Sequence, residues 1–195
     1  MIFVPQQYWL SSAEEKAEYD LHQNEAQDPG YRRFLSRLTV PLMSKLSPGA
    51  TGLDFGCGPG PALSAMLEEQ GYNMVQYDPF YADDPSVQNR RYDFICATEV
   101  VEHLKAPKQT FEQLFSMLKP DGWLGVMTKR VRDQEAFRNW HYIRDLTHIC
   151  FYSKKTFTYL ARTFNAGLEF AGDDVLLLNS QKDESMNNKP NPIRK

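Results

Sequence analysis

The feature that most constrains this chain is a glycine-rich turn between two apolar segments of different periodicity. Residues 51–55 have the length and composition of a buried strand, and residues 59–70 have the apolar spacing of a helix. Gly56, Gly58 and Gly60 lie at the turn between them. Glycine lets a backbone pass close to a ligand, and in open parallel sheets such turns lie at the carboxyl edge, where ligands bind. We therefore expect a sheet protein with a ligand at this loop.

Segments typical of strands and of helices alternate along the rest of the chain. Strands are expected over residues 73–77, 92–97 and 123–127, and helices over residues 111–118 and 153–164. Residues 167–170 and 175–178 flank a polar, glycine-containing turn, which is typical of an antiparallel hairpin. This order predicts an α/β fold with a doubly wound, mostly parallel sheet that ends in a C-terminal antiparallel hairpin.

Composition narrows the class of protein. The chain has 195 residues, 42% hydrophobic and 24% charged, which is typical of one globular domain. The net charge of −3 argues against a broad surface for duplex nucleic acid. Cys57, Cys96 and Cys150 fit neither a disulfide framework nor a structural zinc site, so a cytoplasmic location is expected. No apolar run approaches the length of a membrane span, about 20 residues, so no span is expected. Residues 1–5 have neither a basic region nor a long apolar run, so no signal peptide is expected.

The spacing of the glycines discriminates between nucleotide ligands. The dinucleotide fingerprint G-x-G-x-x-G, started at Gly56, would place its third glycine at position 61, which is Pro61. Asp54 precedes the first glycine by two residues. A carboxylate there would repel a pyrophosphate but suits a cationic ligand. The spacing thus disfavours a nicotinamide-dependent oxidoreductase, while a plain tight turn stays open as the simplest alternative.

Four motifs in order resemble the class I S-adenosylmethionine-dependent methyltransferases. Residues 54–60, D-F-G-C-G-P-G, look like motif I of that family, and Asp78 follows where the family places a ribose-binding carboxylate. Residues 92–104 resemble its fourth strand and the loop after it, and residues 118–122, L-K-P-D-G, resemble the turn before its fifth strand. The resemblance covers roughly residues 50 to 180, and the order of the motifs makes it specific.

The resemblance implies a Rossmann-like methyltransferase sheet and S-adenosylmethionine as the cofactor. A carboxylate accepts the paired donors of a ribose well, which suits Asp78. The residues that the resemblance places at the cofactor are Asp54, Gly56, Cys57, Gly58, Gly60, Asp78, Pro79, Thr98 and Glu99.

The chain departs from the family pattern after Asp78. Only residues 79–92 separate Asp78 from Asp93, which is too short for the usual helix and third strand, since these need at least about 15 to 20 residues. The third strand is therefore expected to be reduced or missing, with a more open adenine edge. Asp83 and Asp84 are candidate substitutes for the acid near the adenine. Phe80 and Tyr81 are candidates to stack on it, and simple loop packing is the alternative.

A second group of chemically competent residues follows the 92–97 strand. Placed on a helix, Glu99, Glu102 and His103 share one arc of about 100°. His148 follows the next strand, and parallel strands deliver their loops to one edge. Two carboxylates and imidazole can ligate a divalent ion, Mg²⁺ or Mn²⁺. The E-x-x-E-H segment with a later histidine resembles the metal site of small-RNA 2′-O-methyltransferases, and ubiquinone-pathway O-methyltransferases carry a similar segment.

The alternative is a site without metal. Glutamates are favoured in the first turn of a helix by its dipole, and His103 and His148 could pack or orient loops. Without an ion, His103 or His148 is the candidate general base, because an imidazole pKa lies near working pH.

Residues 129–145 interleave basic and aromatic side chains after the fifth expected strand, so they are expected to overhang the acceptor. Such a mixture suits an anionic or planar acceptor. The alternative is a solvated helix whose Phe137 and Trp140, at i and i+3, pack inward.

The chain is expected to divide into three parts. Residues 1–48 form an N-terminal helical lid, residues 49–180 the methyltransferase core, and residues 181–195 a polar, disordered tail. In many relatives of the resembled family an N-terminal helix closes over the cofactor, and here Tyr19 and His22 could meet the cofactor or the acceptor.

The function expected is S-adenosylmethionine-dependent methyl transfer (EC 2.1.1.-) to a small-molecule acceptor, most simply on oxygen, with an anionic acceptor allowed. A metal-assisted RNA 2′-O-methyltransferase and a non-catalytic cofactor-binding relative stay open as alternatives. The sequence names neither the acceptor nor the oligomeric state.

Overall fold

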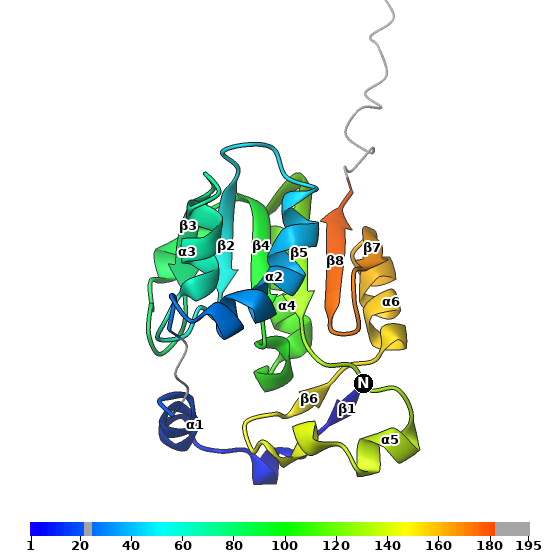
Figure 1. Ribbon diagram of the computed structural model, residues 1–195. Coiled ribbons are helices and arrows are strands. Elements are labelled where there is room, and N and C mark those ends of the chain that lie inside the picture. The colour runs from blue at the N-terminus through cyan, green and yellow to red at the C-terminus, as the bar shows by residue number, and fades with distance from the viewer. Residues whose placement is uncertain (22–24, 182–195) are drawn as a thin grey trace, which may run out of the picture.

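A computed structural model describes residues 1–21 and 25–181 (Figure 1). His22 and the expected tail, residues 182–195, lie outside the described residues. One six-stranded sheet forms the centre, in the order β3-β2-β4-β5-β8-β7. Its strands are β2 (Thr51–Phe55), β3 (Asn73–Tyr77), β4 (Tyr92–Thr98), β5 (Leu118–Met127), β7 (Ala166–Phe170) and β8 (Val175–Ser180). The first four are parallel, and β8 runs antiparallel to both β5 and β7. The predicted α/β class and C-terminal hairpin are confirmed.

The expected loss of the third strand is also confirmed. After β3 the chain forms a tight bridge between Asp78 and Ala82 and a 3₁₀ turn, η2 (Pro85–Asn89), before it enters β4. Among the described residues, no strand pairs with the outer edge of β3. Asp84, a candidate substitute for the adenine-side acid, instead caps η2 through a hydrogen bond from the Ser86 amide, 2.9 Å.

Helices cover both faces of the sheet because its strands alternate. In β4, Phe94 and Cys96 pack with α2 (Pro29–Met43) and α3 (Ala62–Glu68) on one face. Ile95 and Ala97 point to the other face, toward α4 (Pro107–Ser116) and α6 (Lys154–Thr163). No helix in the described part of the chain is long and apolar enough to cross a membrane.

A separate layer lies beyond the carboxyl ends of the parallel strands (Figure 1). It contains α1 (Ser12–Tyr19), α5 (Gln134–Arg138), the 3₁₀ turns η1 (Gln6–Tyr8) and η4 (His141–Arg144), and a two-stranded sheet of β1 (Ile2–Phe3) and β6 (Cys150–Phe151). The sequence did not indicate β1 or β6, because each has only two residues and pairs across the length of the chain. This layer covers the carboxyl edge of the sheet, where the glycine loop after β2 lies.

Candidate functional site

The glycine loop after β2 has the conformation that its sequence requires. Gly56 and Gly58 have φ values of 77° and 66°, in the left-handed region. The Gly56 amide donates to the Tyr77 carbonyl, 2.7 Å, which ties the loop to the end of β3. A Cβ on Gly56 would lie 2.4 Å from Cγ2 of Val100. The loop therefore touches the segment that follows β4, which carries the second predicted group.

Two buried carboxylates flank this loop. Asp78 accepts from the Gly58 amide through Oδ2, 3.0 Å, and from the Phe80 amide through Oδ1, 2.8 Å. Asp54 accepts from the Ser64 hydroxyl, 2.9 Å, and burial raises its pKa to about 6 despite that bond. Both acids thus lie at the carboxyl edge, held by hydrogen bonds within the protein.

The other residues predicted at the cofactor lie along the same edge. Cys57 is half-buried in the loop, where burial raises the pKa of its thiol to about 12. Gly60 precedes α3, and Pro79 follows Asp78. Thr98 ends β4, and its hydroxyl is buried without a hydrogen-bond partner among the described residues.

Glu99, Glu102 and His103 were predicted to share one face of an α-helix. This prediction is wrong, because the segment after β4 is not an α-helix. Glu99 has a left-handed φ of 51°, and its amide donates to the Met127 carbonyl, 2.8 Å. A single 3₁₀ turn follows, η3 (Val101–His103). Val100 packs on Gly56 and Val101 lies in the core, and these contacts hold the sharp turn in place.

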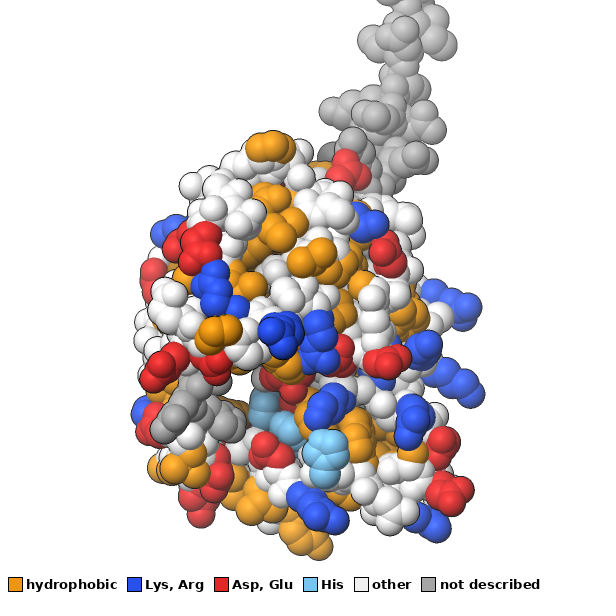
Figure 2. All heavy atoms as spheres, in the orientation of Figure 1, with side chains coloured by type: hydrophobic (Ala, Val, Ile, Leu, Met, Phe, Trp, Pro, Cys, Tyr) orange, Lys and Arg blue, Asp and Glu red, His pale blue; other side chains and the backbone are white. Residues whose placement is uncertain are grey.

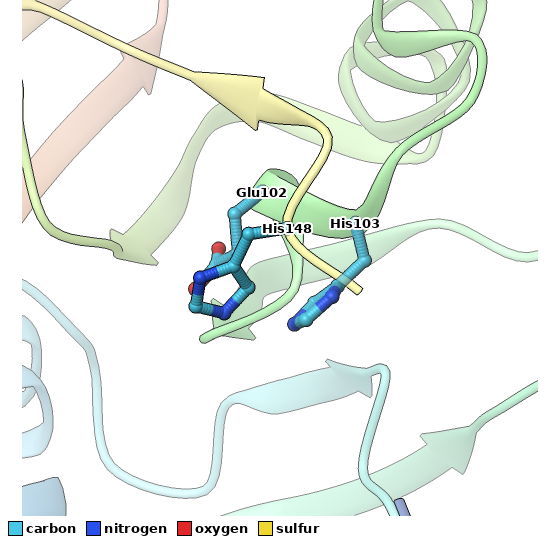
Figure 3. Close-up of side chains that lie close together, drawn as sticks. All are labelled: Glu102, His103 and His148. Atoms are coloured by element: carbon cyan, nitrogen blue, oxygen red, sulfur yellow. The ribbon is translucent and has the colours of Figure 1, made fainter. Parts of the chain in front are cut away.

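The turn nevertheless brings Glu102, His103 and His148 together (Figure 3). One ligand atom from each lies within 4.8 Å of the others. Glu102 and His103 come from η3, and His148 comes from the loop before β6. In space-filling view a hollow opens below the sheet edge, with histidine side chains on its wall (Figure 2).

Both imidazoles are oriented by backbone carbonyls. Nδ1 of His103 lies 3.0 Å from the Thr147 oxygen, and Nδ1 of His148 lies 2.8 Å from the Tyr142 oxygen. A carbonyl only accepts, so each Nδ1 carries the proton and each Nε2 carries the lone pair. Burial lowers the pKa of His148, although Nε2 lies 3.5 Å from Oδ2 of Asp145. This is the arrangement by which outer partners orient histidine ligands.

Glu99, predicted as a fourth ligand, is outside the three-residue group. The Tyr142 hydroxyl connects it: this hydroxyl donates to Oε1 of Glu102 and lies 3.4 Å from Oε2 of Glu99. Sequence reasoning placed Tyr142 only in the mixed basic and aromatic stretch. No local signal marks its role, because its partners lie about forty residues earlier in the chain.

Glu99 and Glu102 are buried carboxyl groups whose charged forms the surrounding protein stabilises only in part. Burial and their mutual repulsion raise the pKa of Glu99, and burial raises the pKa of Glu102. Within the described residues, Oε1 of Glu99 and Oε2 of Glu102 are buried without a hydrogen-bond partner. Such oxygens are costly to bury, so the group fits a bound cation.

Helix α1 lies over both parts of the site. Its Tyr19 ring meets His103 edge-on, with centroids 5.3 Å apart, and contacts Phe80 at 5.9 Å. Asp20, just after α1, accepts from the Tyr81 hydroxyl, 2.6 Å. Phe80 and Tyr81, predicted as adenine-stacking candidates, thus contact the N-terminal segment.

Within residues 129–145, Phe137 and Trp140 pack inward, as the alternative interpretation of this segment predicted. Phe137 and Trp140 have ring centroids 5.2 and 6.2 Å from that of Phe151. Arg130 is buried and donates to the carbonyls of Gly172 and Val175. The helix itself, α5, is only five residues long.

The sheet order and the glycine loop define a class I, Rossmann-like methyltransferase. A family profile described as a methyltransferase domain matches residues 25–169. The chain therefore belongs to this family of S-adenosylmethionine-dependent methyltransferases.

Solved structures agree on the fold. An O-methyltransferase family protein from Burkholderia thailandensis matches with a TM-score of 0.56 and 13% identity, over 91% of this chain and 62% of that one. A methyltransferase from Methanosarcina mazei matches with 0.56 and 12%, over 73% and 98%. CalO1, a methyltransferase of calicheamicin biosynthesis with S-adenosylhomocysteine bound, matches with 0.57 and 11%, over 88% and 59%. No curated protein matches the chain.

Proposed function

We propose that this methyltransferase transfers the methyl group of S-adenosylmethionine to an oxygen of a small-molecule acceptor. The observation that carries the proposal is the contact between Gly56 and Val100. It joins the glycine loop to the turn that bears Glu102 and His103, so a cofactor at the loop would present its methyl group toward these side chains. Burial disfavours the charged form of Asp54, and the positive charge of the cofactor nearby would stabilise that form.

Catalysis would depend mainly on positioning. A lone pair of the acceptor oxygen attacks the methyl carbon in line with the carbon–sulfur bond, and this bond breaks toward sulfur. The hydroxyl proton passes to a base. In the ion-free protein the base is Nε2 of His148, because burial keeps this imidazole neutral and Nδ1 is already protonated. His103 is held beside it, with ring centroids 4.9 Å apart.

We further propose that Glu102, His103 and His148 hold a divalent ion. The partnerless Oε2 of Glu102 and the two oriented imidazoles make a fitting donor set. Two nitrogen ligands favour Mn²⁺ over Mg²⁺, which prefers oxygen. When bound, the ion would lower the pKa of the acceptor hydroxyl. Glu99 and Tyr142 would then set the charge and orientation of Glu102.

The N-terminal segment is proposed as a lid. Tyr19 contacts His103 and Phe80, and Lys105 pairs with Glu15 of α1, 2.8 Å. These contacts would exclude water from the reacting groups. Residues 49–180 would then bind the cofactor beneath α1.

A second candidate is methyl transfer to a 2′-hydroxyl of RNA. The same three-residue group favours it, because an ion there could hold two neighbouring hydroxyls. The chain's net charge of −3 favours the small-molecule acceptor.

Calorimetry tests which cofactor the protein binds, and methyl-transfer assays run side by side test which class of acceptor it uses. Wild-type protein should bind S-adenosylmethionine and not NAD⁺, and Asp78→Asn should weaken that binding at least about ten-fold, because an amide offers one acceptor oxygen instead of two. Methyl transfer from labelled cofactor should then be detected with a panel of small hydroxylated acceptors. Binding of NAD⁺ alone would refute the cofactor, and transfer to RNA alone would refute the small-molecule acceptor.

A further inference from the structure

A broad groove lies beside the candidate acceptor site, and nothing in the proposed reaction uses it yet. It encloses about 820 Å³ between the stretch after β5, the start of α6 and the β7–β8 turn. Lysines, arginines and two acids line it together with Val131, Trp140 and Ser153. Figure 2 shows Lys and Arg side chains projecting on the side of the molecule that carries α6.

The positive charges in this groove outnumber the negative ones. Asp174 forms an ion pair with Arg37, 2.7 Å. The guanidinium of Arg130 donates to the Gly172 carbonyl and lies near the Asp173 carboxylate. Four further cations line the groove and form no ion pair with any described residue: Lys129, Arg132, Lys154 and Lys155. The groove is therefore built to receive negative charge.

The position of two of these cations is electrostatically unfavourable for the fold. Lys154 and Lys155 are the first two residues of α6, after the capping hydroxyl of Ser153. The start of a helix carries partial positive charge and favours acids, yet this first turn holds none. Two lysines there raise the local positive potential, and a bound anion would relieve it. The Lys154 ammonium also lies 5.4 Å from the centre of the Phe170 ring, a cation–π contact that offsets part of this cost.

The groove adjoins the candidate acceptor site through Lys129. The Lys129 ammonium lies 5.2 Å from the centre of the Tyr142 ring, and the Tyr142 hydroxyl donates to Glu102. The Thr128 amide, one residue earlier, donates to the Asp174 carbonyl at the groove wall, 2.8 Å. Lys129 is therefore the lining residue that links the groove to the hydroxyl that holds Glu102.

We propose that this groove binds an anionic group, a phosphate or carboxylate, of the methyl acceptor itself. The inference rests on the proposed function and names its substrate class: a hydroxylated small molecule with an anionic end. The hydroxyl would lie at Glu102, His103 and His148, and the anionic end at Lys129, Arg132, Lys154 and Lys155. Lysines bind phosphate as point charges, and arginine adds a planar pair of donors.

The test measures anion binding without chemistry. Inorganic phosphate and a small phosphate monoester are titrated into wild-type protein and into Lys154→Gln/Lys155→Gln by calorimetry. The expected result is saturable binding of both probes to the wild type, weakened at least ten-fold in the double variant. The single variant Lys155→Gln should show an intermediate loss. Lys108→Gln, an exposed lysine on α4, is the matched control and should bind like the wild type.

Thermal unfolding and cofactor titration separate a specific loss of anion binding from damage to the fold or to the cofactor site. The glutamine variants should unfold at an unchanged or higher temperature, because they remove cations from a helix start, and should keep wild-type affinity for S-adenosylmethionine. A failed cofactor titration would count against the proposed function alone. Equal phosphate binding by wild type and double variant would refute the proposed anion site in the groove. Binding of single-stranded RNA without binding of either small probe would also refute it.

Discussion

The two halves of the site differ in how their buried charges are satisfied. On the cofactor side, Asp78 accepts backbone amides with both oxygens and Asp54 accepts the Ser64 hydroxyl. On the acceptor side, Glu99 and Glu102 each keep a buried oxygen without a partner within the described residues. The Thr98 hydroxyl on the cofactor side is also buried without a partner in the described part of the chain, so the two halves differ in their carboxyl groups. The aspartates accept hydrogen bonds from the protein, whereas each glutamate keeps an oxygen without a partner among the described residues.

From this difference we expect ligands to affect the two halves of the site in different ways. Hydrogen bonds hold the side chains of Asp54 and Asp78 in place before the cofactor binds, so binding there should need little rearrangement. Buried carboxylates without partners destabilise the folded state until a cation or a proton arrives. Substitutions on the cofactor side should therefore damage shape, and substitutions on the acceptor side should mainly change charge and ion binding.

The largest effect is expected for Gly56→Ala, which breaks the shape of the cofactor side. The new Cβ would lie 2.4 Å from Val100, and alanine would be held at a φ of 77°. Strain and overpacking should together cost about 2–4 kcal/mol of the free energy of unfolding and abolish cofactor binding. Gly58→Ala has a similar φ but open space within 4 Å, so it should cost only about 1–2 kcal/mol. Urea unfolding and calorimetry measure both, and equal losses would refute the close contact.

The next effect concerns the Asp54 carboxyl group, whose charged form is disfavoured by burial. The Asp54 pKa rises from 3.8 to about 6 on folding, so the folded state binds its proton more tightly. The stabilisation from that proton is fully present below pH 3.8 and is lost as the pH rises through about 6, by about 2–3 kcal/mol. Urea unfolding of wild type and Asp54→Asn between pH 4.5 and 7 should show the wild type losing stability relative to the variant. Parallel pH profiles would contradict this.

A smaller effect should distinguish hydrogen bonds to charged and neutral partners. Tyr142→Phe removes the donor to Glu102 and should cost about 1.5–3 kcal/mol. Tyr152→Phe removes a buried donor to the Val101 carbonyl, 3.0 Å, and should cost about 0.5–1.5 kcal/mol. Chemical unfolding of the two variants compares them directly. If Tyr152→Phe were the more damaging substitution, the acceptor side would not carry the charge assigned to it.

The smallest effect is expected at α1, which lies over both halves. Tyr19→Ala removes the ring contacts with His103 and Phe80, so methyl transfer should fall several-fold while cofactor affinity changes little. Tyr8→Ala, exposed in the same N-terminal segment, is the control. Steady-state rates and cofactor titrations measure the two variants, and wild-type rates for Tyr19→Ala would argue against a lid.

Sequence reasoning succeeded where structure is local. The bounds of β2 and β3 follow from short apolar runs between glycines and polar turns, and the glycine spacing gives the loop. It failed where distant contacts decide. The turn at Glu99 depends on Val100 packing against Gly56, and β1 exists only through pairing with β6. Tyr142 gains its role from Glu102, forty residues earlier, and a single sequence contains no sign of that contact.

The most direct test of this account is a calorimetric titration of Mn²⁺ into wild-type protein and Glu102→Gln. We expect saturable binding of one ion to the wild type and a loss of affinity of at least about ten-fold in the variant, because a charged ligand is replaced by a neutral amide. Glu112→Gln, exposed on α4, should bind like the wild type. Equal affinity in wild type and Glu102→Gln, or no saturable binding to the wild type, would contradict the divalent-ion site.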